Sequence, residues 1–485
     1  MQMDDTRRIS SGTPGLDEVL CGGLLRGQTG MITGGPGSGK TIIALQFLAA
    51  AEESGLYIGF EEREEDLRRN AESLGIDLSD VTVLDLSAEG DRFFSQEAYT
   101  VFPSEEVEGE DLLERIATAI DEESPERLAI DPLSELRSLL PDDHQFRRNI
   151  SSLVNELKER DISMLCTTQP TIHDAEQDLQ FLGDATIEIR RTTNHRSLEV
   201  TKFRGSDFAA GRHTYRIEGG TGGHVYPKLV PGDHERDRPR DQLAAGIDEL
   251  DSLLGGGIER GSVTVISGPS GVGKTTLGTL LMKASAEQGD ESLGFLFEEL
   301  QSDYLYRSAQ ISLDVEPLLE SDDLHLEEIE SLTQSPDEIA NRVRTAVEEE
   351  GVETVMIDGI TGYRLGLRGE DTQAELTREL HALCRYLKRM GVTTFLIEEV
   401  DSITGEFSAT DEEISYLADN IVFLRYLELD GEIRKAIGVL KKRFGDFEQS
   451  LREFSISGDG VTVGPKLTGM RGLLTGTPER IDEGN

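Results

Sequence analysis

Two short glycine-rich segments have the composition and spacing of phosphate-binding loops. They are Gly34, Gly35, Pro36, Gly37, Ser38, Gly39, Lys40 and Thr41, and Gly268, Pro269, Ser270, Gly271, Val272, Gly273, Lys274 and Thr275. Both satisfy G-x-x-x-x-G-K-[ST], in which consecutive backbone N–H groups converge on phosphate oxygens. In each loop the lysine would neutralise the β- and γ-phosphates of ATP, and the threonine hydroxyl would bind Mg²⁺. The segments therefore predict two nucleotide-binding sites.

Each half of the chain also has an aspartate suited to hold that Mg²⁺ through its water shell. Asp131 and Asp358 each end a short apolar run, and they follow the P-loop lysines at similar distances, 131 − 40 = 91 and 358 − 274 = 84 residues. An apolar run ending in aspartate is a weak motif alone, but its recurrence favours a role in the site. We expect each aspartate at the carboxyl end of a strand neighbouring the P-loop strand.

Adjacent acids follow the next predicted strand of each half. The strands end in Phe60-Glu61-Glu62 and Phe297-Glu298-Glu299. A carboxylate at the edge where the γ-phosphate sits can orient or deprotonate a water molecule or a substrate hydroxyl. The predicted catalytic residues are therefore Glu61, Glu62, Glu298 and Glu299; the alternative is a charged cap before an acidic helix. Thr168 and Glu398, after later strands, are candidates for sensing the γ-phosphate.

Two cations, separated by one residue, occur late in each half. They are Lys202 and Arg204, and Lys441 and Arg443. Residues two apart on a strand face the same side, so each pair could act on one ligand. Because they lie far along the chain from the P-loop, they could neutralise the nucleotide of a neighbouring subunit, as an arginine finger does. The alternative is that they are surface cations paired with acids.

These residues recur because the chain is a tandem duplication. Three blocks beginning at Gly12, Gly22 and Gly34 return with one offset, 246 − 12 = 256 − 22 = 268 − 34 = 234. Between the copies, prolines alternate with charged residues, a composition typical of a linker. We predict a first domain at residues 1–226, a linker at 227–242 and a second domain at 243–485.

The elements that must position these residues form an α/β pattern. Short apolar runs predict strands at 29–33, 56–60, 129–131, 163–167, 186–190 and 198–203, and an amphipathic run predicts a helix at 41–51. Near-continuous apolar strands alternating with helices indicate a mainly parallel sheet with helices on both faces. The later strands, joined by tight polar segments, predict an antiparallel extension. Ligands of such sheets bind at the carboxyl ends of the strands.

Together, these motifs resemble the KaiC family of tandem RecA-like ATPases over nearly the whole chain. The resemblance rests on residues 12–17, both P-loops, both Glu-Glu pairs, both aspartates, both Lys-x-Arg segments and residues 474–480. It implies two RecA-like P-loop NTPase domains, ATP and Mg²⁺ as ligands, and a homo-hexamer with ATP at subunit interfaces. It also implies that the four glutamates are catalytic and that the paired cations reach the neighbour's γ-phosphate.

The resemblance further implies serine/threonine autokinase activity in the second domain. Ser415 falls on the family's phosphorylated serine and is the predicted phosphoacceptor, with Thr410 as the second choice. Tyr416 stands where the family has its phosphorylated threonine, which departs from a two-site cycle. Regulatory protein partners are expected, and their identity is open.

Composition restricts the remaining possibilities. Lys and Arg number 48 against 94 Asp and Glu, a net charge of −46. Such an acidic surface disfavours unassisted binding to nucleic acid or to anionic membranes. It favours a soluble cytoplasmic protein of a high-salt organism, such as a halophilic archaeon. The alternatives left open are a RecA/RadA-like DNA-dependent ATPase of recombination or repair and a nucleotide-binding scaffold with negligible turnover.

Overall fold

The structure, a computed structural model, divides into two compact units. It describes residues 8–87, 105–138, 143–169, 182–193, 195–237, 241–330, 333–365, 373–400, 416–429, 431–468, 470–471 and 479–480. Unit 1 comprises Met1–Lys228 and unit 2 Leu229–Asn485. The start of unit 2 is bound to its own helix α14 (Gln373–Arg389), because Arg389 Nε donates to His234 O at 2.9 Å and Arg236 N donates to Arg389 O at 3.0 Å.

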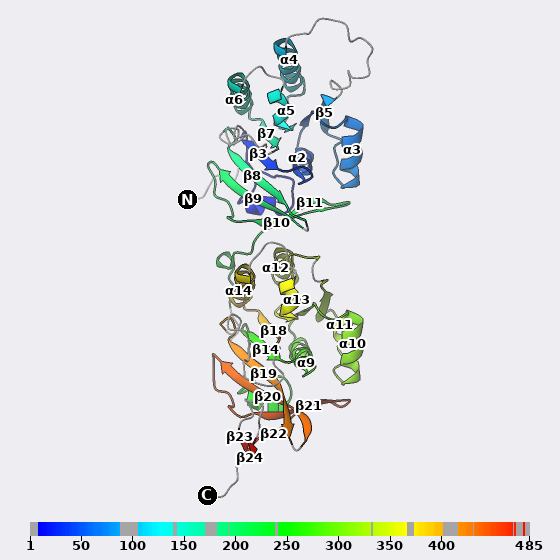
Figure 1. Ribbon diagram of the computed structural model, residues 1–485, viewed down its shortest axis with the longest axis vertical. Helices are drawn as coiled ribbons and strands as arrows, with labels where there is room; N and C mark the ends of the chain where they lie inside the picture. Colours follow the sequence, from blue (N-terminus) through cyan, green and yellow to red (C-terminus); the bar gives the residue numbers. More distant parts are fainter. Residues whose placement is uncertain are drawn as a thin grey trace. The chain divides into compact units, whose positions relative to one another are not determined.

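Unit 1 is built on one sheet in which nine strands are described, in the order β11-β10-β9-β8-β3-β7-β6-β4-β5 (Figure 1). The strands are β3 (Thr29–Gly34), β4 (Gly55–Gly59), β5 (Val81–Asp85), β6 (Arg127–Asp131), β7 (Ser163–Thr168), β8 (Ala185–Arg191), β9 (Arg196–Phe203), β10 (His213–Glu218) and β11 (Gly222–Tyr226). The helices are α1 (Leu16–Val19), α2 (Lys40–Ala49), α3 (Glu64–Ser73), α4 (Glu105–Glu123), α5 (Leu133–Ser138) and α6 (Asp143–Glu159). The strands β8, β3, β7, β6, β4 and β5, in this spatial order, are parallel to their neighbours. β9, β10 and β11 continue the sheet with antiparallel pairing.

Unit 2 repeats this plan, with nine described strands in the order β16-β15-β17-β18-β14-β19-β20-β21-β22. The strands are β14 (Val263–Gly268), β15 (Ser292–Leu296), β16 (Leu324–Glu328), β17 (Thr354–Asp358), β18 (Thr393–Glu399), β19 (Asn420–Leu429), β20 (Glu432–Lys442), β21 (Arg452–Ser457) and β22 (Gly460–Lys466). Besides α14, the helices are α8 (Asp248–Leu253), α9 (Lys274–Glu287), α10 (Gln301–Gln310), α11 (Glu316–Glu320), α12 (Pro336–Thr345), η5 (Ala346–Glu350) and α13 (Ile360–Leu365). β20, β21 and β22 form the antiparallel extension.

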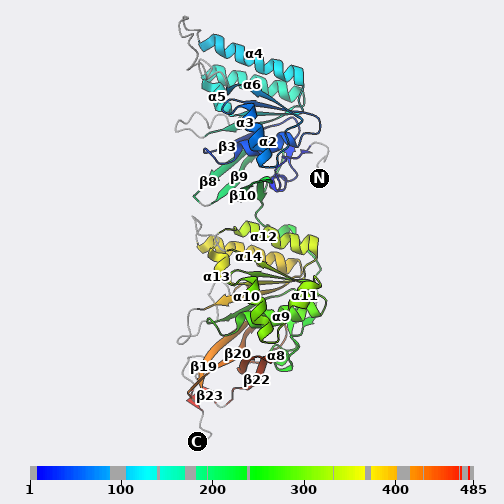
Figure 2. The ribbon, with the colours of Figure 1, turned by 90° about the vertical axis from the view of Figure 1, so that its right-hand side faces the viewer.

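Helices cover both faces of each sheet, as the sequence predicts (Figure 2). In unit 1, α2 and α3 pack with Ile32, Tyr57 and Leu165 in one apolar cluster. On the opposite face, α4, α5 and α6 pack with Met31 and Met164 in a second cluster. Neighbouring strand residues thus go to opposite clusters, which is the period-two alternation of a sheet buried on both sides.

Two details of the sequence expectation are wrong. β4 ends at Gly59 and β15 at Leu296, so the Glu-Glu pairs lie in the turns after these strands and not on them. The aspartate strands β6 and β17 are not neighbours of the P-loop strands β3 and β14, since β7 and β18 lie between them. Strand order in a parallel sheet is set by the crossover helices, and chain order does not reveal it.

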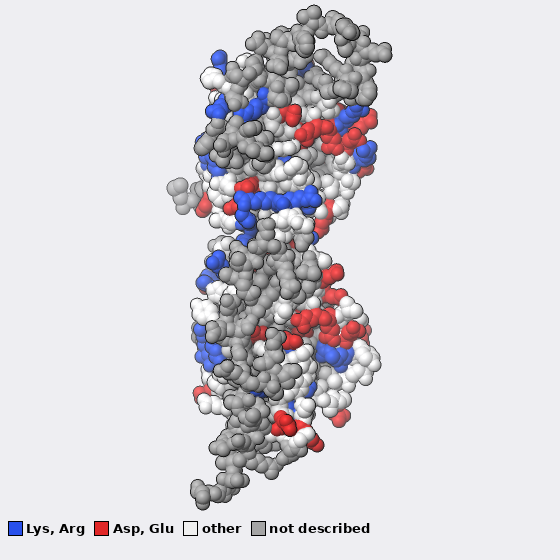
Figure 3. Space-filling view, in the orientation of Figure 1, with Lys and Arg blue, Asp and Glu red and all other residues white. Residues whose placement is uncertain are grey.

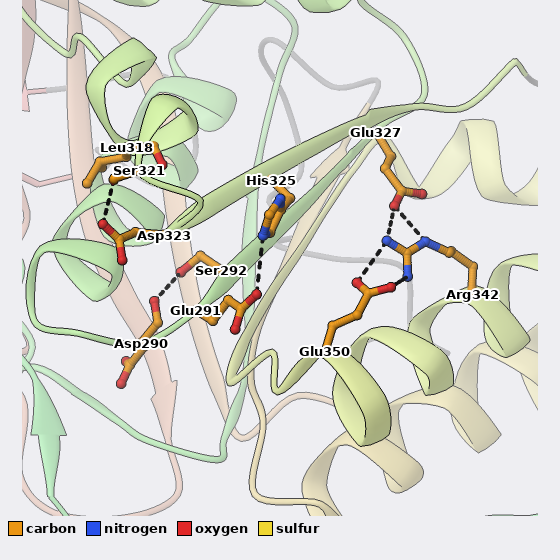
Figure 4. A network of polar contacts seen from close by, with 10 residues as sticks. All are labelled: Asp290, Glu291, Ser292, Leu318, Ser321, Asp323, His325, Glu327, Arg342 and Glu350. Atoms are coloured by element: carbon orange, nitrogen blue, oxygen red, sulfur yellow. Dashed lines mark hydrogen bonds and ion pairs between the residues drawn. The ribbon is translucent and has the colours of Figure 1, made fainter.

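The few cations of this acidic chain are shared among several acids. On the face drawn in Figure 3, acidic side chains gather beside α3 in unit 1 and beside α10 in unit 2, and Lys and Arg lie both next to these acids and along the left-hand side of each unit. Figure 4 shows one shared cation, Arg342 of α12, which donates to Glu327 of β16 at 2.6 Å and to Glu350 of η5 at 2.6 and 3.0 Å. His325 contacts Glu291 in the same region.

Among the described residues, none of the helices is apolar and long enough to cross a bilayer.

Candidate nucleotide sites

Each P-loop connects the first core strand to the first core helix. The loop 34–41 joins β3 to α2, and the loop 268–275 joins β14 to α9. Gly39 and Gly273 precede these helices with φ of 101° and 113°, a conformation that L side chains rarely adopt. The helix N-terminus therefore points its unpaired N–H groups toward the loop, where an anionic phosphate group is stabilised.

The antiparallel extension supports each loop from behind. A Cβ atom added at Gly39 would lie 2.6 Å from Ile217 of β10, and one added at Gly273 would lie 2.5 Å from Ile456 of β21. Tyr215, also on β10, donates its hydroxyl to Gly39 O at 3.2 Å. The extension, of which β10 and β11 were not predicted individually, therefore packs closely against both glycines, and their positive φ angles are what favours glycine there.

The P-loop lysines are buried and hydrogen-bonded. Lys40 Nζ donates to Gly34 O and Gly35 O at 2.8 and 3.1 Å. Burial lowers the pKa of Lys40, and Asp131 and Glu61 partly offset this. Lys274 Nζ donates to Pro269 O at 3.0 Å and to the carboxylate of Glu399 at 3.3 Å. In unit 1 the aspartate and the first glutamate are therefore close enough to Lys40 to affect its pKa.

The two aspartates have different donors. Asp131 accepts hydrogen bonds from Tyr57 OH at 2.9 Å and from the hydroxyl of Thr167. Asp358 accepts from Thr275 Oγ1 at 3.1 Å. Burial raises the pKa of Asp358 to about 7; the Thr275 hydrogen bond opposes this rise, and Glu298 adds to it.

The residues suit Mg²⁺ that is bound mainly by phosphates. Thr275 and Asp358 bring a hydroxyl and a carboxylate together, the pair that P-loop proteins use for this ion. Thr41 is the second residue of α2, after Lys40, and occupies the equivalent position in unit 1. Within the described ranges, no group of three or more His, Cys, Asp and Glu side chains could hold a metal alone. Mg²⁺ commonly takes one or two protein ligands with substrate phosphates and water, so such a cage is not needed.

The two glutamates of each Glu-Glu pair have different surroundings in the structure. Asn70 of α3 donates to Glu62, and Arg307 of α10 donates to both oxygens of Glu299 at 3.1 and 2.8 Å. Both donors lie eight residues after the glutamate that they hold, so the two units share this arrangement. The second glutamate is therefore held by the following helix, whereas the first is close enough to the P-loop lysine for that lysine to lower its pKa.

The first glutamates have carboxyl groups that take up protons more readily than usual, and burial raises the pKa of Glu62 as well. Burial raises the pKa of Glu61, with further increases from Asp131 and Glu135 and a partial decrease from Lys40. Burial likewise raises the pKa of Glu298, Glu399 raises it further, and Lys274 partly offsets both. Such raised values are typical of groups that exchange protons during catalysis.

The strand between the P-loop strand and the aspartate strand contributes residues that sequence analysis missed. Thr168 ends β7, and Glu398 is buried on β18 opposite Ser267. The next residues along the chain, Gln169 and Glu399, contact the first glutamate of unit 1 and the P-loop lysine of unit 2. Gln169 Nε2 donates to Glu61 Oε1 at 3.2 Å, and Glu399 contacts Lys274. Two adjacent acids, Glu398 and Glu399, end β18, and this pair was the sequence signal that could have identified Glu399.

The paired cations lie at the opposite end of the sheet from the P-loop of their own unit. Lys202 pairs with Thr186 on β8, and Lys441 pairs with Ile421 on β19, near the beginnings of β3 and β14. Arg204 lies 3.8 Å from Asp184, and Arg443 donates to Asp419 at 3.0 Å. Each unit therefore does not bring these cations to its own phosphate loop.

In unit 2 the cations line a cavity of about 440 Å³ beside α14. Lys388, Arg385 and Arg389 of α14 line it together with Lys441 and Arg443, and Lys388 and Arg443 both pair with the buried Asp419. Tyr416 also lines it and is largely exposed. The cavity thus concentrates positive charge in a chain that is otherwise acidic. Ser415 and Thr410, the predicted phosphoacceptors, lie outside the described residues.

Comparisons with known proteins agree with this architecture. A protein-family model described as "ATPase: KaiC" matches residues 9–230 and again residues 243–468. The circadian clock protein KaiC3 of Synechocystis is 27% identical over 98% of this chain and 95% of its own length. The circadian clock oscillator protein KaiC of Rippkaea orientalis is 26% identical over 99% of this chain and 93% of its own length.

Proposed function

The chain belongs to the KaiC family of ATPases, and we propose that both of its P-loops bind ATP with Mg²⁺ and hydrolyse it. The observation that carries this proposal is the geometry of the two loops: Lys40 and Lys274 are buried and donate to backbone oxygens of their loops, and Thr275 donates to the strand-end Asp358 at 3.1 Å. The raised pKa of Glu61 and of Glu298 agrees with it. Phosphoryl transfer needs charge neutralisation, an oriented metal and a group that positions the attacking oxygen. Each unit holds a candidate for each of these parts.

In this proposal the residues have separate tasks. The loop N–H groups and Lys40 or Lys274 hold the phosphate oxygens, while Thr41 or Thr275 and the strand-end aspartate hold Mg²⁺. Bound Mg²⁺ would neutralise charge on the phosphates. Glu61 or Glu298 accepts a proton from the attacking water, and Glu62 or Glu299 positions the turn through Asn70 or Arg307.

We further propose a homo-hexamer with nucleotide at the subunit interfaces. Lys202 and Arg204, and Lys441 and Arg443, lie at the sheet end opposite to the P-loop of their own unit. In a closed ring with head-to-tail contacts, that end of one subunit meets the P-loop end of the next. The cations would then neutralise the neighbour's γ-phosphate, which fits the cationic cavity beside α14.

The second unit also carries the proposed autokinase activity. Ser415 directly precedes Tyr416, which lines the cavity that contains Lys441 and Arg443. A nucleotide bound by a neighbour at that cavity would place its γ-phosphate near the segment with Ser415. The hydroxyl of Ser415 would attack this phosphate in place of water, with the neighbour's Glu298 accepting the proton and ADP leaving.

Incubation with γ-labelled ATP at molar salt, followed by phosphate-release measurement and phosphosite mapping, tests these proposals. Molar salt screens the self-repulsion expected at a net charge of −46. Phosphate release that is lost in the Lys40→Ala/Lys274→Ala variant supports the ATPase, and label on Ser415 supports the kinase. Release without protein label reduces the function to an ATPase. ATP-dependent retention of single-stranded DNA would favour the recombination alternative, and binding without turnover would favour a scaffold.

A further inference from the structure

The two P-loop lysines have different partners, although their loops are alike. Lys40 donates only to backbone oxygens of its own loop among the hydrogen bonds of the described residues, at 2.8 and 3.1 Å. Lys274 donates to one backbone oxygen at 3.0 Å and also to Glu399 Oε2 at 3.3 Å. The second lysine is therefore already partly neutralised by a carboxylate of its own unit.

The residue equivalent to Glu399 in unit 1 is a neutral amide. Glu399 is the last residue of β18, and Gln169 directly follows β7, the strand at the same place in the sheet order. Gln169 donates to the proposed base Glu61 at 3.2 Å and does not add a charge. At this position unit 2 carries one more negative charge than unit 1. The preceding position differs in the same sense, since the buried Glu398 of β18 corresponds to Thr168 of β7.

Glu399 lies at the carboxyl end of β18, in contact with the lysine that would hold the third phosphate of ATP. Its strand lies between the P-loop strand and the strand of Asp358, and its carboxylate is close enough to Glu298 to raise the pKa of that residue. A γ-phosphate held by Lys274 and attacked from the side of Glu298 would therefore enter beside a second anion. Like charges a few ångströms apart repel, and both anions would compete for one ammonium group.

We propose that Glu399 sets the preference of the second site between ATP and ADP: it pairs with Lys274 in the absence of a γ-phosphate and opposes the binding of one. This inference rests on the proposed function, in which both sites bind ATP. The Glu399 side chain is 40% exposed, whereas Lys274 is 8% exposed, so the carboxylate is the partner that can move into solvent. Binding of ATP in unit 2 then requires that the Lys274–Glu399 ion pair be broken, and the described residues of unit 1 contain no equivalent pair. Binding of ADP, which has no γ-phosphate, is opposed less.

The test compares ADP with a non-hydrolysable ATP analogue by titration calorimetry with Mg²⁺. Full-length protein is used, with Lys40→Ala to isolate the second site and Lys274→Ala to isolate the first. Adding Glu399→Gln to Lys40→Ala should raise the affinity for the ATP analogue about fivefold, near the upper range for a partly exposed ion pair. The affinity for ADP should change by less than about twofold on the same scale. The reciprocal Gln169→Glu, added to Lys274→Ala, should weaken the ATP analogue selectively.

Glu353→Gln is the matched control. Glu353 is exposed and precedes β17, at the end opposite to Asp358, so this variant removes one negative charge from unit 2 without touching the site. It should leave both affinities unchanged, and thermal unfolding verifies that each variant is folded. Equal gains for ADP and the ATP analogue in Glu399→Gln, or no gain for either, would overturn the inference while the proposed function stands. Absence of nucleotide binding in both single-site backgrounds would overturn the proposed function itself, and this inference with it.

Discussion

Arg307 holds both carboxylate oxygens of Glu299, with Nε–Oε1 and Nη2–Oε2 distances of 3.1 and 2.8 Å. The same guanidinium donates to Thr276 Oγ1 at 3.3 Å, so it joins α10, the P-loop helix α9 and the turn after β15. A two-point pair between guanidinium and carboxylate fixes orientation as well as distance. Glu299 is therefore suited to position the turn, and Glu298, whose pKa is raised by burial and by Glu399, is suited to accept a proton.

This difference predicts unequal effects of two isosteric substitutions. In the Lys40→Ala background, Glu298→Gln should lower kcat by about 10²- to 10⁴-fold, because a general base contributes that much. Glu299→Gln keeps a hydrogen-bond acceptor for Arg307 and should lower kcat by about tenfold or less, within the strength of one charged hydrogen bond. Steady-state phosphate release measures both. A larger loss in Glu299→Gln than in Glu298→Gln would contradict the assignment.

The pH dependence of the second site should reflect the raised pKa of Glu298. The base must be ionised to accept a proton, so kcat should fall as the pH decreases through this pKa, which lies above the ordinary value of 4.5. Burial is the main cause, and Glu399 adds to it. Glu399→Gln should therefore move the acidic limb of the kcat profile to lower pH, in the Lys40→Ala background. Glu353→Gln should leave the limb in place, and a limb that does not move in Glu399→Gln would argue against an electrostatic effect of Glu399 on Glu298.

The position of Lys441 and Arg443 predicts complementation between subunits. With the first site inactivated by Lys40→Ala, Lys274→Ala removes the P-loop lysine and Arg443→Ala removes the cation that acts on the neighbour. Each variant alone should show little phosphate release. Mixed rings should regain activity, because some interfaces then combine an intact P-loop with an intact Arg443. Activity of Arg443→Ala equal to that of its parent would show that the cation has no role in turnover.

Tyr57 should affect Mg²⁺ in the first site alone. Its hydroxyl donates to Asp131 at 2.9 Å, and loss of such a supporting hydrogen bond typically weakens metal binding about 10- to 100-fold. In the Lys274→Ala background, Tyr57→Phe should raise the Mg²⁺ concentration needed for half-maximal phosphate release. Tyr304→Phe in unit 2, which removes a hydroxyl bonded to Thr279, is the control and should not change this requirement. An unchanged requirement in Tyr57→Phe would mean that Thr167 suffices to orient Asp131.

The sequence by itself determined the duplicated plan of the chain. The P-loops, the strand-end aspartates and the Glu-Glu turns are local signals, since each depends on residue types within a few positions and on one strand-to-helix connection. The mainly parallel sheets with helices on both faces followed from apolar periodicity. The same local signals could not separate Glu61 from Glu62 or Glu298 from Glu299, because adjacent residues have the same composition.

Only the tertiary structure decided which of these residues meet. Sheet order inserted β7 and β18 next to the P-loop strands, which brought Gln169 to Glu61 and Glu399 to Lys274 over 108 and 125 residues of chain. It also placed Lys441 and Arg443 at the far end of the sheet from Lys274. Contacts of this kind depend on how crossover connections order the strands, and no local pattern of residues records that order.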